Sequence, residues 1–224
     1  MKVTIKNKFW KVFVLDILFV VIFIGVFFFI RKSLISYVGV LELLQGNLQS
    51  ISSTNIEQTS SIIQSLNRSA TKAYIYTFIL APLILFLIYV LIQGFSWRIV
   101  NKRDKTYFLK FGLISIPFYV FLILFSLESF KNVFYGILML ISGYFAFVFY
   151  VHPSFNMIRN SLKKFYLFLP MYILFIIIFF LYLFSGFLAF ISLFIGNYSV
   201  MLPFSVVITL IFSFYKLFLI EKYG

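Results

Sequence analysis

Asp16 is the one acidic residue that lies well within an apolar stretch of the sequence, here the stretch at about 12–30. Counted from Lys11 at about 1.5 Å per helical residue, its carboxylate lies about 7 Å beyond the start of that stretch. An ionised carboxylate in an apolar medium is costly unless it is paired, so we expect Asp16 to face other helices. Two interpretations are open, a substrate or proton site and a single ion pair that holds helices together, and we favour the ion pair.

Lys110 and Lys216 are expected at a similar depth in two other apolar stretches, with Gln93 and His152 nearby. We take Asp16, Lys110, Lys216 and His152 as a candidate intramembrane polar cluster. His152 is the only histidine of the chain, and it stands at the end of an apolar stretch without a neighbouring acid. We therefore interpret it as an interfacial side chain rather than a catalytic one.

Patterns that mark known catalytic and cofactor sites are missing from the sequence. It has no P-loop, no H-E-x-x-H motif, no nucleophile elbow and no Gly-rich dinucleotide fingerprint. A metal site needs several His, Cys, Asp or Glu ligands, whereas the chain has one histidine, no cysteine and six scattered acids. We therefore expect that the protein is not an enzyme, uses no cofactor, and has no catalytic or metal-binding residues.

The composition is typical of a membrane protein. Apolar residues make up 63% of the 224 residues, against about 45–50% in soluble domains. In a soluble protein, the net charge of +13 would suggest nucleic acid as the partner. Here the basic residues fall between apolar stretches of about 20 residues, the length that crosses a hydrocarbon core of about 30 Å. We therefore expect a multi-pass membrane protein that binds no nucleic acid.

Hydropathy divides the chain into six apolar stretches of spanning length. The predicted spans are at about 12–30, 74–93, 107–127, 133–151, 165–185 and 200–220. The expected fold class is all-α, a six-transmembrane-helix bundle that forms a single integral membrane domain over residues 1–224. In size and span count the chain is similar to the substrate-binding subunits of energy-coupling-factor vitamin transporters, but its first span lacks the A-x-x-x-A pattern of that family.

The distribution of basic residues predicts the orientation of these spans. With the N-terminus inside, 14 of the 19 Lys and Arg residues lie on the cytoplasmic side. The remaining five, on the outside, are Arg31, Lys32, Arg68, Lys72 and Lys131. We expect a protein of the cell membrane whose N- and C-termini are both cytoplasmic.

Two connectors on the predicted cytoplasmic side are basic and amphipathic. In the stretch 152–166, apolar residues recur at helical spacing and predict a short helix in the headgroup layer. Basic residues lie on the opposite face of this helix. The connector 94–110 has a similar arrangement of apolar and basic residues. The candidate contacts with anionic lipid are Arg159, Lys163, Lys164, Arg98, Lys102, Arg103 and Lys105.

The segment between the first two spans, at 33–72, is far longer than a tight connection of about 2–8 residues. It carries apolar residues at heptad-like spacing in two parts, separated by the turn sequence SSTN at 52–55. We expect an extracytoplasmic helical hairpin whose arms extend the first two spans. Its uncharged polar exterior suits contact with a protein partner, and the alternative is a hairpin that merely covers the outer mouth of the bundle.

Residues 165–196 form an almost unbroken apolar run. As one helix this run would be about 48 Å long, which exceeds a bilayer of about 40–45 Å. We expect a break at Ser185–Gly186. Residues 187–195 would then be either an apolar segment in the outer interface or a re-entrant half-helix.

Two functions from different classes follow from these patterns. The scarcity of intramembrane polar groups favours a non-enzymatic scaffold or interaction subunit. Prolines inside four spans and the re-entrant half-helix favour a small-solute transporter or a membrane subunit of one.

A shift of 58 residues lays the second and third spans onto the fourth and fifth. This similarity is either a true repeat or the common pattern of membrane helices.

Overall fold

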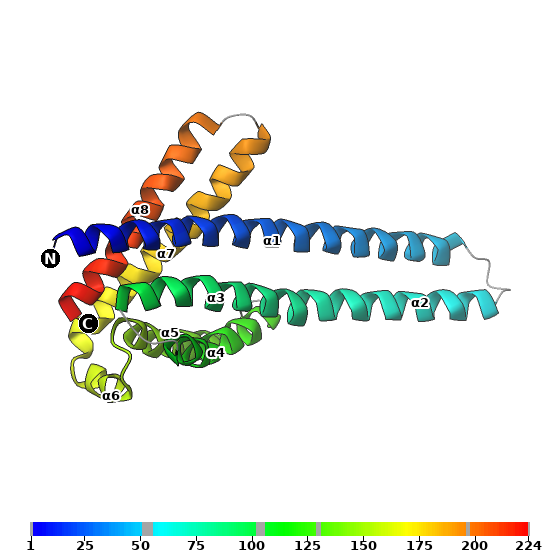
Figure 1. Ribbon diagram of the computed structural model, residues 1–224. Coiled ribbons are helices and arrows are strands. Elements are labelled where there is room, and N and C mark those ends of the chain that lie inside the picture. Colours follow the sequence, from blue (N-terminus) through cyan, green and yellow to red (C-terminus); the bar gives the residue numbers. More distant parts are fainter. Residues whose placement is uncertain (1, 51–55, 102–105, 129–130, 196–197, 224) are drawn as a thin grey trace. The chain divides into compact units, whose positions relative to one another are not determined.

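The structure is a computed structural model that describes residues 2–50, 56–101, 106–128, 131–195 and 198–223. Within those ranges all regular elements are helices, coloured along the chain in Figure 1. In chain order they are α1 (Lys2–Ser50), α2 (Ile56–Ile75), the π-helix η1 (Tyr76–Leu80), α3 (Ala81–Asn101), α4 (Thr106–Leu127), α5 (Val133–Val151), α6 (Phe155–Lys163), α7 (Phe165–Ile195) and α8 (Tyr198–Tyr223).

Six helical stretches among the described residues are long and apolar enough to cross a membrane. They are Lys8–Leu43, Ser60–Asn101, Thr106–Leu127, Val133–Val151, Phe165–Leu193 and Ser199–Tyr223. The predicted all-α polytopic membrane fold is therefore confirmed. The first two stretches are longer than the predicted spans because their helices continue into the 33–72 hairpin.

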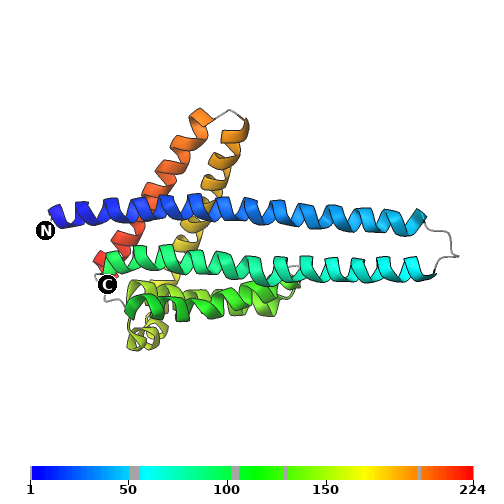
Figure 2. The ribbon, with the colours of Figure 1, turned by 45° about the vertical axis from the view of Figure 1, so that its right-hand side comes forward.

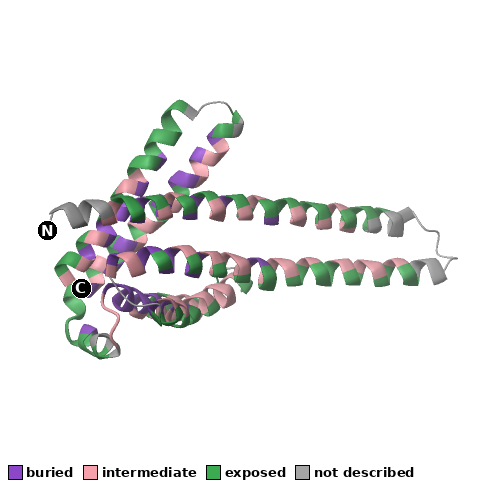
Figure 3. Cartoon of the chain, viewed as in Figure 1, coloured by how far each residue is buried: buried purple, intermediate pink, exposed green. Residues whose placement is uncertain are grey.

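The chain forms two compact units. Unit 1 comprises Met1–Ile24 and Phe86–Gly224, and unit 2 comprises Gly25–Leu85. Figure 3 shows that buried residues concentrate in the helices of unit 1. Among the described side chains of unit 2, only Ile30 and Ala81 are buried.

Within unit 1, the first part of α1 runs antiparallel to α3. The Lys8 ammonium donates to the Val100 carbonyl at 3.1 Å, whereas Asp16, two turns further along α1, contacts Gln93. The pairs α4–α5 and α7–α8 each form a hairpin of adjacent helices, as Figures 1 and 2 both show. The start of α1 and the end of α8 lie at the same end of the unit, as an even number of spans requires.

Aromatic rings fill much of the core of unit 1. Tyr182 stacks on Phe212 with ring centroids 4.5 Å apart and on Phe19 with ring centroids 6.2 Å apart. Phe111 and Tyr150 stack at 4.4 Å. Such rings bury a large apolar area and have few rotamers, so they define how the helices face one another.

The helix α7 runs unbroken through Ser185 and Gly186, so the predicted break is wrong. Gly186 is instead a packing position, because a Cβ there would overlap the Val20 side chain of α1. Ser185 is buried, and its hydroxyl donates to a carbonyl of its own helix at 2.9 Å. Residues 187–195 thus belong to one continuous helix and are neither a separate interfacial segment nor a half-helix.

The length of α7 is accommodated without a break. Its 31 residues extend about 46 Å at 1.5 Å per residue. A helix longer than the hydrocarbon core fits a bilayer by tilting, at a modest cost in free energy.

A separate short helix, α6, follows α5, as the 152–166 pattern predicts. Its Ser161 is buried against the bundle, where the Ser161 carbonyl accepts a hydrogen bond from the Tyr144 hydroxyl at 3.2 Å. Leu162 is 57% exposed. The connector 94–110 differs, because α3 continues to Asn101 and no separate helix is described there.

In unit 2, the end of α1 and the helix α2 are antiparallel arms that lie side by side in Figures 1 and 2. The ring of Tyr37 on α1 lies 6.0 Å from the ring of Tyr76 in η1, which directly follows α2. The predicted apolar seam is partly open, since Ile63 is 47% exposed. The turn at 51–55 lies outside the described residues.

The π-helix η1 ends at Leu80, two residues before Pro82. Proline has no N–H, and in an α-helix its ring would clash with the carbonyl four residues earlier, that of Phe78. The wider π turn relieves this clash. The Thr77 hydroxyl adds a hydrogen bond to the Ala73 carbonyl at 2.7 Å, so the helix continues through the proline.

Candidate functional site

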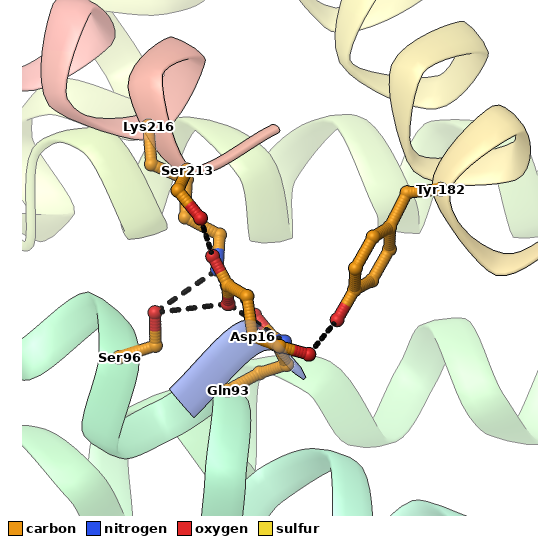
Figure 4. Close-up of polar contacts among 6 residues, drawn as sticks. All are labelled: Asp16, Gln93, Ser96, Tyr182, Ser213 and Lys216. Carbon is orange, nitrogen blue, oxygen red and sulfur yellow. Dashed lines mark hydrogen bonds and ion pairs between the residues drawn. The ribbon is translucent and has the colours of Figure 1, made fainter. Parts of the chain in front are cut away.

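Asp16 and Lys216 form a buried ion pair in unit 1, shown in Figure 4. Lys216 Nζ lies 2.6 Å from Asp16 Oδ1, and both side chains are fully buried. Asp16 belongs to α1 and Lys216 to α8, so the pair joins two helices from opposite ends of the chain.

Two side chains of α3, Gln93 and Ser96, bridge the charges. The Gln93 amide donates to Asp16 Oδ1 at 3.2 Å, and its oxygen accepts from Lys216 at 2.6 Å. The Ser96 hydroxyl accepts from Lys216 at 3.0 Å and donates to Asp16 at 3.3 Å. Residues three apart share one face of a helix, so α3 presents both groups to the same pair.

Ser213 and Tyr182 complete the surroundings of Asp16. The Ser213 hydroxyl of α8 donates to Asp16 Oδ2 at 2.6 Å. The Tyr182 hydroxyl of α7 donates to the backbone carbonyl of Asp16. Side chains from α3, α7 and α8 therefore meet at one residue of α1, as Figure 4 shows.

This network uses the full donor capacity of Lys216. An ammonium group has three N–H donors, and Asp16, Gln93 and Ser96 accept from them. Both carboxylate oxygens of Asp16 accept hydrogen bonds, and the two formal charges cancel. A neutral and satisfied network is what a buried site requires, since an unpaired buried charge costs several kcal/mol.

Aromatic rings enclose the ammonium group. Lys216 Nζ lies 4.4 Å from the centroid of the Phe212 ring and 5.7 Å from that of Trp97. Both rings are buried. The ring faces attract the cation and exclude water, which strengthens the ion pair.

A second polar network surrounds Tyr150 near the end of α5. Its hydroxyl bonds with Ser115 of α4 at 2.6 Å and with Tyr89 of α3 at 3.2 Å. Its carbonyl accepts from Asn101 at 2.8 Å and from Tyr107 at 3.4 Å. A carbonyl in the last turn of a helix lacks an intrahelical donor, so these contacts satisfy the end of α5.

The other residues of the predicted cluster lie elsewhere. Lys110 is exposed on α4, and no described contact connects it to Asp16. His152 is the C-cap of α5, and its Nδ1 is buried without a hydrogen-bond partner among the described residues. The structure thus brings together Asp16 and Lys216 but not Lys110 or His152.

The candidate lipid contacts fall into two groups. Arg159, Lys163 and Lys164 are exposed on and beside α6. Arg98 is half-buried, with its guanidinium 6.0 Å from the centroid of the Phe95 ring. Three further candidates, Lys102, Arg103 and Lys105, lie outside the described residues.

Sequence reasoning missed Ser96, Ser213 and Tyr182 as members of the network. A usable signal was present, because Gln93 and Ser96 are three residues apart, as are Ser213 and Lys216. Two polar residues on one face of an otherwise apolar span indicate a polar contact inside the bundle.

The described contacts of Asp16 and Lys216 are an ion pair, hydrogen bonds and contacts with aromatic rings. Among the described residues, no group of three or more His, Cys, Asp or Glu side chains could hold a metal ion. A scan against protein-family models and searches of curated proteins and solved structures found no match for the chain.

Proposed function

We propose that this protein is a non-enzymatic membrane scaffold, a helical bundle whose surfaces hold partner proteins and anionic lipid. The observation that carries the proposal is the saturated network around Asp16 and Lys216. All three N–H donors of Lys216 are hydrogen-bonded to groups of the same chain, so none is free to bind a solute. Such a pair suits the task of holding α1, α3 and α8 in one arrangement.

A small-solute transporter, or a membrane subunit of one, is the alternative. One observation favours it: an ionisable pair inside a membrane bundle is a candidate for a substrate or proton path. A solute amine would have to displace Lys216 from Asp16, so transport would require a second state in which the pair is open. The scaffold needs no second state.

The surface of α6 supports contact with anionic lipid at the cytoplasmic face. Arg159, Lys163 and Lys164 are exposed, and so is the apolar Leu162. A short helix with apolar and cationic faces lies naturally in the headgroup layer, with its charges beside lipid phosphates. The orientation that this requires has both termini in the cytoplasm of a cell-membrane protein, as the basic residues predict.

The hairpin of unit 2 supports contact with a protein. It exposes large apolar side chains, with Leu43 at 72% and Ile63 at 47%. Exposed apolar groups on a segment outside the bilayer are a common feature of interaction surfaces. In the proposed orientation this surface is extracytoplasmic.

Excision of residues 37–66 tests the scaffold proposal. The deleted segment lies within unit 2, whereas the Asp16 network lies within unit 1, so the six spans should remain folded when a short Gly-Ser linker joins the ends. The full chain and the shortened chain are purified in mild detergent and compared by native mass spectrometry. We expect a protein partner with the full chain and its loss from the shortened chain.

A matched variant, Leu43→Ser with Ile63→Ser, keeps the hairpin length and removes exposed apolar side chains. It should lose the same partner if those side chains make the contact. If a protein partner stays bound to both altered forms, recognition by the hairpin is wrong. If a small solute is released from the full chain instead of a protein, the transporter is supported and the scaffold is not.

A further inference from the structure

An open groove of about 420 Å³ lies on unit 1 between α1 and α3. It is lined by Trp10, Lys11, Val14, Leu15 and Ile99. The lining surface is apolar, and Lys11 contributes its aliphatic stem to it.

The four lining residues of α1 form one face of that helix, since they are spaced at one, three and four residues. Val14 is 59% exposed and Trp10 is 53% exposed. Asp16, which follows closely, is fully buried in the ion pair. The groove therefore lies on the outer, lipid-facing side of α1, and the polar network lies on the inner side.

The charged side chains of the segments beside the groove are cationic, and the adjacent Asp16 is neutralised by Lys216. The segments 8–15 and 94–101 contain Lys8, Lys11 and Arg98 and no acidic residue. Lys8 is engaged with the Val100 carbonyl near the end of α3. Lys11 is exposed at the rim, and no described residue makes a hydrogen bond or ion pair with it.

The order of these groups along α1 matches the order of groups in a phospholipid. Lys11 stands towards the helix start, and Leu15 lies about 6 Å further along the helix at 1.5 Å per residue. The Trp10 side chain is of the kind that prefers the boundary between headgroups and hydrocarbon. In the orientation that the basic residues predict, a cation thus lies on the headgroup side of an open apolar groove.

We infer that this groove is a binding site for one anionic phospholipid. Its acyl chain lies against Val14, Leu15 and Ile99, and its phosphate faces Lys11. A groove open to the bilayer side is filled by lipid chains in any case, and Lys11 gives the site its preference for negative headgroups. This inference deepens the proposed contact with anionic lipid and rests on the same membrane orientation, but it does not depend on the protein partner of the hairpin.

Quenching of Trp10 fluorescence by brominated lipid tests the inference. The purified full chain is placed in vesicles that contain brominated-chain phosphatidylglycerol or brominated-chain phosphatidylcholine, each diluted with its unbrominated counterpart. Trp97, the second tryptophan, is 1% exposed and serves as an unquenched background, which the Trp10→Phe variant measures directly. Subtracting the quenching of the Trp10→Phe variant from that of the native chain gives the quenching of Trp10 alone. Its value for each lipid gives the relative affinity of the two lipids beside Trp10.

We expect phosphatidylglycerol to bind beside Trp10 about fivefold more tightly than phosphatidylcholine, the factor that corresponds to about 1 kcal/mol for one cation near lipid phosphate. Lys11→Gln should abolish the preference, and Lys11→Arg should retain it. Lys110→Gln is the matched control, because Lys110 is an exposed lysine on another helix of the unit. It should leave the preference unchanged.

Three outcomes would overturn the inference. Equal quenching by the two lipids in the native chain would mean that the groove holds ordinary bilayer lipid without selection. An equal loss of preference in Lys110→Gln and Lys11→Gln would assign the effect to the overall surface charge. Absence of quenching by both lipids would show that protein, such as a helix of a second chain, covers the groove.

Discussion

At the residue scale, the side chains around Asp16 and Lys216 satisfy one another, so their contribution to stability depends on keeping both charges. Removing one partner of a buried ion pair costs about 3–5 kcal/mol, because the other charge stays buried without compensation. Replacing both by apolar groups of similar size is often neutral or stabilising. The pair therefore makes a specific prediction for single and double variants.

Lys216→Met should lower the free energy of unfolding by about 3–5 kcal/mol, whereas Asp16→Leu combined with Lys216→Met should recover most of that loss. Lys110→Met is the control, and we expect a change within about 0.5 kcal/mol because Lys110 is exposed. The measurement is helical circular dichroism during unfolding in detergent mixtures. A Lys216→Met variant as stable as Lys110→Met would contradict a buried pair.

Depth in the span was enough to select Asp16 and Lys216 from the sequence, but it selected Lys110 as well. Depth follows from counting residues, whereas the direction of a side chain depends on how its helix is rotated about its axis, which neighbouring helices determine. The serines were missed for another reason. A serine in a helix commonly donates to a carbonyl of its own helix, as Ser115 and Ser185 do. Only their three-residue spacing from Gln93 and Lys216 distinguishes Ser96 and Ser213 from such serines.

At the element scale, Gly186 shows that a glycine in a membrane helix can indicate either a break in the helix or a position of close packing against a neighbouring helix. It was interpreted as a helix break, yet it permits close packing of α7 on α1 at Val20. In lipid, small residues bring helices together, while the hydrocarbon surroundings discourage any break in backbone hydrogen bonding. The existence of the helices was predictable from apolar length, but the end of α7 was not, and the role of this glycine required the position of its neighbour.

Gly186→Ala should destabilise unit 1 by about 1–3 kcal/mol, because the added Cβ overlaps the Val20 side chain. Val20→Ala in the same chain should relieve part of that loss by making room. The matched control is Gly39→Ala, since a Cβ at Gly39 meets open space. Alanine there should stabilise its helix by about 0.5–1 kcal/mol. Equal effects at the two glycines in a thermal unfolding measurement would exclude the packing role of Gly186.

The helix α6 gives a second prediction at this scale. The chain has no cysteine, so Asn160→Cys accepts a single environment-sensitive fluorophore at an exposed position of α6. Replacing Arg159, Lys163 and Lys164 together with Gln should reduce the effect of anionic lipid on its emission, each charge accounting for about 1 kcal/mol.

Lys131→Gln is the control for this measurement, because Lys131 is exposed in the connector between α4 and α5. It should leave the emission change intact. If the triple variant responds to anionic vesicles as strongly as the native sequence, α6 does not bind anionic lipid through these residues.

At the scale of the whole molecule, the number of spans and their order were predictable because bilayer thickness sets the length of each apolar stretch. The arrangement of the helices within unit 1 was not, since apolar side chains that face lipid and those that face protein have the same composition. The aromatic stack of Phe19, Tyr182 and Phe212 illustrates this. Its three members come from α1, α7 and α8, and each looks like any other ring in a chain with 34 phenylalanines.

The orientation of the molecule is the last prediction, and it follows from the distribution of Lys and Arg. Single cysteines at Arg68 and Lys131 should react with an impermeant thiol reagent added to intact cells, whereas cysteines at Lys163 and Lys222 should react only after the membrane is opened. All four positions are exposed, so a lack of labelling reports the membrane barrier rather than burial. Denatured samples give the control for total reactivity. Labelling of Lys163→Cys in intact cells would reverse the orientation and would place α6 on the outer face.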